Sequence, residues 1–158
     1  MLIGRKYRKF ALLVKDMNYI ADKKRHDGYC KALYKNGIPK QNQLFYNGSV
    51  KMEFLDSILG NLIAEKVECI ICGDDEVCTM IMSRLQAEGY RIPMDIAVAS
   101  LYNSPNLECY SPPVTSVNVA ASQMGNVTGK QLIQCLLGRN YETRTMVDYD
   151  IMFRKSTK

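Results

Sequence analysis

A cluster of carboxylates follows a short apolar run in the middle of the chain. Asp74, Asp75 and Glu76 come just after Cys69–Cys72. Carboxylates at the end of a strand can hold a divalent metal ion, and together with Asp16 they could serve a small metal-dependent hydrolase. The same side chains can cap a helix instead, because they accept hydrogen bonds from free backbone amides and offset the positive end of the helix dipole. A polar contact to a ligand is the third possibility.

Other catalytic and metal-binding patterns are weak. The chain has one histidine, His26, and lacks the Gly-x-Ser-x-Gly, Walker and Gly-x-Gly-x-x-Gly motifs. Cys69 and Cys72 flank two isoleucines, and alternation along a strand points the two thiols to opposite faces. No second cysteine pair follows at zinc-finger spacing. We therefore expect reduced, mostly buried thiols, no bound metal and no cofactor.

Apolar runs alternate with helical patterns over the first hundred residues. Gly37 and Gly89 close two of the expected helices, and Ser49 is a candidate cap for another. This alternation predicts an α/β fold, a three-layer sandwich with a parallel sheet between helices. The expected elements are strands at 10–14, 43–46, 69–72 and 95–101, and helices at 25–36, 51–65 and 75–88.

The pattern changes after the fourth expected strand. Residues 102–113 contain three prolines and are expected to form a loop. A short extended piece at 114–117 leads into an expected helix at 120–137, and residues 145–153 alternate like a strand with one better-buried face.

The carboxyl ends of the expected strands form the natural ligand edge of such a sheet. Arg25 lies in this region and could grip a pair of sugar hydroxyls or an anion, or be a plain surface arginine. Tyr19 and Tyr102 could stack on a ligand or simply close the sheet edge. The segments at this edge are 15–25, 47–48, 73–74 and 102–103.

Composition excludes several classes of protein. The 158 residues are 47% hydrophobic and 23% charged, which is ordinary for a globular domain. The formal net charge is +5, and four basic residues within the first ten account for most of it, so the chain lacks the broad basic surface of a nucleic-acid binder. No apolar run is long enough to cross a membrane, and the start does not look like a signal peptide. We expect a cytoplasmic protein.

Six segments, in order, resemble motifs of the LacI/GalR transcription regulators. The segment from Arg25 to Leu33, for example, fits R-x-x-G-[FYW]-x-x-A-L. Such a motif is weak alone, whereas six in the same order over residues 7–157 are specific. The matching segments are Tyr7–Leu13, Arg25–Leu33, Cys72–Asp75, Gly89–Val98, Ser111–Val117 with Met124–Gly125, and Phe153–Ser156.

The resemblance implies a periplasmic binding protein-like fold of two lobes with an effector between them. Residues 7–113 and 144–156 then form the carboxyl-terminal lobe, and residues 114–140 are a crossover segment and helix that belong to the other lobe. Nearly all of that other lobe and the DNA-binding headpiece are expected to lie outside this chain. The apolar face of the helix at 118–137 should be exposed, or covered by a second chain.

The resemblance also implies effector-binding residues: Arg25, Asp74, Tyr19, Tyr102 and Asn103. Arg25 and Asp74 keep the residue types of the family. Gly73 stands where an asparagine is usual, Gly48 where an aromatic is usual, and Tyr102 where an aspartate is usual. Each missing group should cost about 1–3 kcal/mol of sugar affinity, so we expect a simple hexose to bind weakly or not at all.

The function implied is that of a ligand-sensing and dimerising domain of a transcription regulator, not an enzyme. Its partners would be a small polar effector, a second copy of the chain, and operator DNA only in a longer protein with a helix-turn-helix. The alternatives are the metal-dependent hydrolase that uses Asp16, Asp74 and Asp75, and a dimerisation module without a ligand. The resemblance places the dimer interface at Cys78, Ile81, Cys109 and Tyr110.

Overall fold

The structure is a computed structural model that describes residues 2–48 and 51–157. Its centre is a six-stranded sheet in the order β2-β1-β3-β4-β5-β6. Every ladder from β2 to β5 is parallel, and β6 pairs with β5 in the antiparallel direction. The strands are β1 (Phe10–Val14), β2 (Gln43–Asn47), β3 (Cys69–Cys72), β4 (Ala97–Ser100), β5 (Thr115–Val119) and β6 (Tyr149–Met152).

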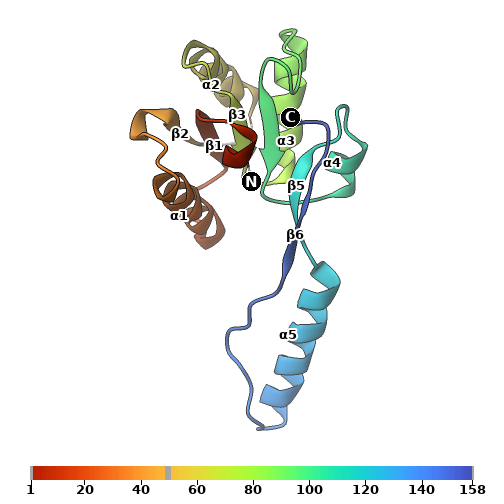
Figure 1. The fold of residues 1–158 in the computed structure, drawn as a ribbon. Helices are drawn as coiled ribbons and strands as arrows, with labels where there is room; N and C mark the ends of the chain where they lie inside the picture. The colour runs from red at the N-terminus through yellow and green to blue at the C-terminus, as the bar shows by residue number, and fades with distance from the viewer. Residues whose placement is uncertain (1, 49–50, 158) are drawn as a thin grey trace.

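Helices cover both faces of this sheet, which confirms the predicted three-layer α/β sandwich. In Figure 1, α1 lies on one face, and α2 and α3 lie together on the other. The helices are α1 (Ile20–Lys35), α2 (Met52–Ala64), α3 (Asp75–Ala87), α4 (Pro105–Cys109) and α5 (Ala121–Leu136), with short 3-10 turns at Ile3–Arg5 and Lys40–Asn42.

The core has two halves because the central strands are apolar on both sides. Leu12 packs in the half under α1, whereas its neighbour Leu13 packs in the half under α2 and α3. Cys69 and Cys72 separate in the same way, as alternation predicts. All five residues of β1 are buried. This strand therefore lies inside the sheet, between β2 and β3, and fixes the positions of the segments that leave it.

Two predicted helix ends are confirmed and one predicted helix start is wrong. Gly37 and Gly89 adopt φ values of +67° and +83°, the left-handed conformation that ends a helix. Helix α1, however, begins at Ile20 and not at Arg25, because its first turns carry almost no apolar periodicity and resemble a polar loop. The predicted cap Ser49 lies outside the described residues, and Lys51 occupies the N-cap position of α2.

The region after β4 is more regular than its prolines suggest. The expected loop at 102–113 contains the five-residue helix α4, which is anchored by the buried side chain of Leu107. A helix this short has no periodicity that a sequence pattern can reveal. The final strand is also shorter than predicted, since β6 covers only Tyr149–Met152 of the expected 145–153.

Helix α5 stands away from the rest of the molecule on the arm formed by β5 and β6 (Figure 1). None of its described residues is buried, and the side chain of Leu136 is 77% exposed. The predicted exposure of its apolar face is therefore confirmed for this chain. Among the described residues, no helix combines the length and the apolar character that crossing a membrane requires.

Candidate functional site

The carboxyl ends of the first four strands meet at one edge of the sheet, as predicted. The register pairs Val14 with Asn47, and Cys72 with Ser100. Backbone hydrogen bonds continue past the strand ends, from Gly73 N to Leu13 O (2.8 Å) and from Leu101 N to Cys72 O (2.8 Å). The segments that follow these strands are therefore held side by side. We call this edge, with the loops that leave it, the tip edge.

Asp74 caps helix α3 and forms an ion pair across the tip edge. Its Oδ1 accepts a hydrogen bond from the amide of Val77 at 3.0 Å, which confirms the capping interpretation. Its Oδ2 lies 3.0 Å from the Nζ of Lys15, which also contacts Glu76. Burial lowers the pKa of Lys15, but the carboxylates of Glu76 and Asp74 outweigh burial and leave this pKa raised. Lys15 therefore stays protonated and ties β1 to α3.

Arg25 is held at the tip edge by a buried carboxylate. Its Nη1 donates to Asp22 Oδ1 at 2.6 Å, and the side chain of Asp22 is only 6% exposed. The second oxygen of Asp22 accepts a hydrogen bond from the amide of Asp16 at 3.1 Å. The guanidinium is thus linked through one carboxylate to the loop that follows β1. Asp22 was missed by the sequence analysis, although its spacing of three residues from Arg25 is typical of a helical ion pair.

Asn103 belongs to a second polar network centred on Arg154. The Oδ1 of Asn103 accepts hydrogen bonds from Arg154 Nη1 (2.8 Å) and from Ser116 Oγ (2.6 Å). The same guanidinium donates to Val114 O and to Glu108 Oε1, each at 2.8 Å. This network joins the segment after β4 to β5, α4 and the end of the chain. No pattern in the sequence places Arg154 there, since its partners lie 38 to 51 residues away.

The two tyrosines predicted at the site are exposed. Tyr19 is the N-cap residue of α1 and is 66% exposed, and Tyr102 is 48% exposed. Both lie in segments of the tip edge, where their side chains are accessible to solvent.

The two glycines of the tip edge lie against neighbouring groups. A Cβ added to Gly73 would lie 3.2 Å from Val14 Cγ1, which is tighter than an ordinary contact. A Cβ added to Gly48 would come within 2.5 Å of the ring of Phe54. The space that a side chain at residue 48 would need is therefore taken by an aromatic ring from α2.

The arrangement of carboxylates gives no support to the metal-dependent hydrolase. Within residues 2–48 and 51–157, no group of three histidine, cysteine, aspartate or glutamate side chains is placed to hold a metal ion. Asp74 uses its oxygens for Lys15 and the Val77 amide, and an oxygen of Asp16 accepts from the amide of Asn18 at 2.8 Å. These carboxylates therefore cap a helix, form an ion pair and accept hydrogen bonds from nearby backbone amides.

Two of the four predicted dimer residues need correction. Cys78 and Ile81 have no exposed surface and lie in the core beneath α3, because they are on the helix face that packs on the sheet. Neither side chain is exposed for contact with a partner in this structure. Cys109 is exposed, and Tyr110 is half-buried with its hydroxyl 3.4 Å from the carbonyl of Thr79.

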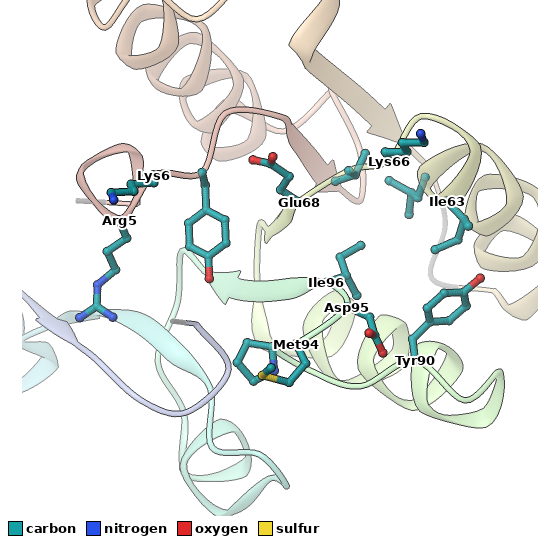
Figure 2. A pocket seen from close by; sticks show the side chains of 13 residues that line it. Arg5, Lys6, Ile63, Lys66, Glu68, Tyr90, Met94, Asp95 and Ile96 are labelled. Atoms are coloured by element: carbon teal, nitrogen blue, oxygen red, sulfur yellow. The ribbon is translucent and has the colours of Figure 1, made fainter.

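A hollow of about 540 Å³ lies at the opposite edge of the sheet, where the strands begin (Figure 2). Lys6 and Lys66 lie on opposite sides of its rim, and Tyr90, Met94 and Asp95 lie along its lower side in this view. The Glu68 carboxylate in its wall accepts hydrogen bonds from the amides of Arg8 and Lys9. None of the predicted effector-binding residues lines this hollow.

Comparison with known proteins assigns the whole chain to one family. The model of the periplasmic binding protein-like domain matches residues 1–157. The transcriptional repressor PurR of Mannheimia succiniciproducens is 21% identical over 99% of this chain and 48% of its own length. The crystal structure of the transcription regulator CcpA of Lactococcus lactis matches 99% of this chain and 58% of its own, with a TM-score of 0.85 and 26% identity.

A CelR–cellobiose complex has the same fold, with a TM-score of 0.82 and 24% identity over 98% of this chain and 48% of that one. The chain spans about half the length of the curated relatives it matches.

Proposed function

The chain belongs to the periplasmic binding protein-like domain family, as the effector-domain part of a LacI/GalR-type regulator, and on this premise we propose that it senses a small polar effector at its tip edge. The observation that supports the proposal is that Arg25, Asp74 and Asn103 all lie in segments at the carboxyl edge of the sheet, and that each is held by a hydrogen bond or ion pair within the chain. These three come from separate segments of the chain, and each is oriented by an intramolecular partner. Preorganised polar groups at the carboxyl edge of a parallel sheet are what a ligand site in this fold requires.

The oriented groups keep capacity for a ligand. A guanidinium has five N–H donors, and Asp22 takes one from Arg25, so donors remain for a pair of hydroxyls or an anion. Tyr102 and Tyr19 offer exposed rings for stacking. The effector proposed is therefore a polar metabolite with hydroxyl or anionic groups and at least one flat face.

A simple hexose is a poor candidate for this effector. Gly73 lacks a side chain to hydrogen-bond a sugar, and the ring of Phe54 fills the space beside Gly48. Each lost stacking or hydrogen-bonding group should weaken binding by about 1–3 kcal/mol. The cellobiose in the CelR complex supports a carbohydrate-like ligand class for the fold, and we propose a larger or charged member of that class here.

We propose that residues 7–113 and 144–156 act as one lobe and that residues 114–140 belong to a second lobe. The exposed apolar face of α5 supports this division, because a helix with no buried residue lacks the packing that stabilises most helices. The matching regulators are about twice as long, so in a protein of that length additional chain is available to cover α5.

In a full-length regulator, effector binding would change the angle between the lobes and so the affinity for operator DNA. We propose a homodimer that uses the exposed side of α3 with α4, and a cytoplasmic location, where a transcription regulator meets its DNA. Residues 1–158 alone should not bind operator DNA tightly. A gel shift at moderate salt checks this, and tight sequence-selective binding would contradict the proposal.

A thermal-shift screen tests the effector site. Cellobiose, glucose 6-phosphate and adenosine represent neutral sugars, sugar phosphates and nucleosides. We expect at least one class to raise the melting temperature, and R25M to remove that shift. R91M is the matched control, because Arg91 is an exposed arginine paired with Asp95 far from the tip edge. Equal shifts for R25M and the unmodified chain, or no shift with any class, would count against an effector site.

A further inference from the structure

The only histidine of the chain lies beside a cysteine where α1 packs against the edge strand β2. The Sγ of Cys30 is 3.5 Å from the Nε2 of His26, one helical turn earlier. The other ring nitrogen, Nδ1, is 3.8 Å from the carboxylate of Asp27. The ring of Phe45, on the edge strand β2, packs on the imidazole with 4.3 Å between centroids. A thiol and a base are thus held side by side, as in an activated nucleophile, and the exposed Asp27 carboxylate lies near the base without hydrogen-bonding to it.

The other five thiols lack this arrangement. Cys69, Cys72 and Cys78 have no exposed surface, and burial raises the pKa of Cys69 and Cys72, which keeps both thiols protonated. Cys109 and Cys135 are exposed, but the single imidazole of the chain is already placed at Cys30. Cys30 is half-buried, so part of this residue is exposed to solvent.

We propose that Cys30 is a modification site that reacts with low-molecular-weight anionic disulfides. The Nε2 of His26 accepts the thiol proton, and the sulfur attacks one sulfur of the reagent. A new S–S bond forms between Cys30 and that half of the reagent, while the original S–S bond breaks. The other half leaves as a thiolate and takes up the proton from the imidazolium. The reagent is the oxidant, and a second thiol reverses the reaction.

The charge of α1 favours an anionic reagent. The helix carries four lysines and one arginine against two aspartates. Lys23 lies one turn before His26 on the same side of the helix. Asp27 lies one turn before Cys30, but the helix as a whole is positive, so a negatively charged disulfide is drawn to α1, and the attraction weakens as salt screens it.

Reaction kinetics at pH 7 test the proposal without any effector. In the C109S/C135S chain Cys30 is the remaining thiol with solvent access, and in the C30S/C109S chain Cys135 is. With the anionic disulfide 5,5′-dithiobis(2-nitrobenzoate), we expect Cys30 to react at least about tenfold faster than Cys135, and H26Q to remove that advantage. With the cationic disulfide cystamine at low salt, the advantage of Cys30 should shrink.

Two further measurements separate a loss of reactivity from a loss of folding or an effect of the substitutions. Circular dichroism melts of H26Q show whether the variant is folded. Treatment of the unmodified chain with glutathione disulfide, followed by peptide mass spectrometry, ranks the thiols without any substitution. Equal rates for Cys30 and Cys135, an unchanged rate in folded H26Q, or a glutathione adduct mainly on Cys109 or Cys135 would each overturn the proposal. The proposed effector site would stand in every one of these cases.

Discussion

Replacing Arg154 by methionine should destabilise the fold by removing one guanidinium from four acceptors. The side chain is 10% exposed and donates to Asn103 Oδ1, Val114 O, Ser116 Oγ and Glu108 Oε1, each at 2.8 Å. Methionine has a similar length and keeps much of the packing, so the change isolates the hydrogen bonds and the charge.

The size of the effect follows from which acceptors are buried. A hydrogen bond to a charged group contributes about 1.5–3 kcal/mol. Val114 and Ser116 are buried and Asn103 is half-buried; Ser116 Oγ and Asn103 Oδ1 keep their bond to each other after the change, so we count these two acceptors as one lost bond. Glu108 is 57% exposed and can turn to water. About two bonds therefore set the loss, and R154M should lower the unfolding free energy by about 3 kcal/mol.

Urea denaturation measures this loss, with R154K and E108Q as matched controls. Lysine keeps the charge but not the planar fork, so R154K should recover about half of the loss. E108Q should cost less than about 1 kcal/mol, because it affects only the exposed partner. A loss below about 1 kcal/mol for R154M, or an equal loss for E108Q, would refute the view that this network joins the segment after β4 to the arm.

Three further predictions concern the tip edge, the core and the arm. D22N should lower the unfolding free energy by about 2 kcal/mol. A double-mutant cycle with R25M should give a coupling energy of at least about 1 kcal/mol, and a coupling energy near zero would show that the two side chains do not stabilise each other. Burial raises the pKa of Tyr29 above its ordinary 10.0. As pH rises past about 10, the unfolded chain loses the Tyr29 proton while the folded chain keeps it. The unfolding free energy should therefore fall, by up to about 1.4 kcal/mol per pH unit. Y29F should show a shallower fall in pH-dependent denaturation, and parallel curves would contradict the assignment. L136K should change stability by less than about 0.5 kcal/mol because the side chain is 77% exposed, and a larger loss in thermal melts would show that this face of α5 is covered.

Much of the fold could be predicted because its signals are local. The run Phe10–Val14 is apolar at every position, which only a strand buried on both faces tolerates in so short a segment. Asp74 and Gly89 mark the two ends of α3 through side-chain capping and a positive φ, and both effects act within a few residues. The rule that ligands bind at the carboxyl ends of parallel strands predicted the ligand edge, and the strand order brings those ends together.

The missed features depend on contacts that a local pattern does not contain. The first turns of α1 are polar and look like a loop, and the burial of Asp22 beside Arg25 is a tertiary feature that the local pattern does not contain. Arg154 lies at the end of the chain, and its network forms because β6 returns beside β5. Cys78 and Ile81 were assigned to an interface by analogy, whereas the pitch of α3 turns them toward the sheet.

Ligand mapping by NMR tests the central claim most directly. A ¹⁵N-labelled chain titrated with millimolar cellobiose, glucose 6-phosphate and adenosine reports even weak binding at each backbone amide. If the tip edge is the effector site, the perturbed amides should cluster at Asp16, Gly73 and Tyr102, which lie in three of its segments. Perturbations confined to Glu68 and Asp95 at the opposite hollow, or none with any ligand class, would contradict the assignment.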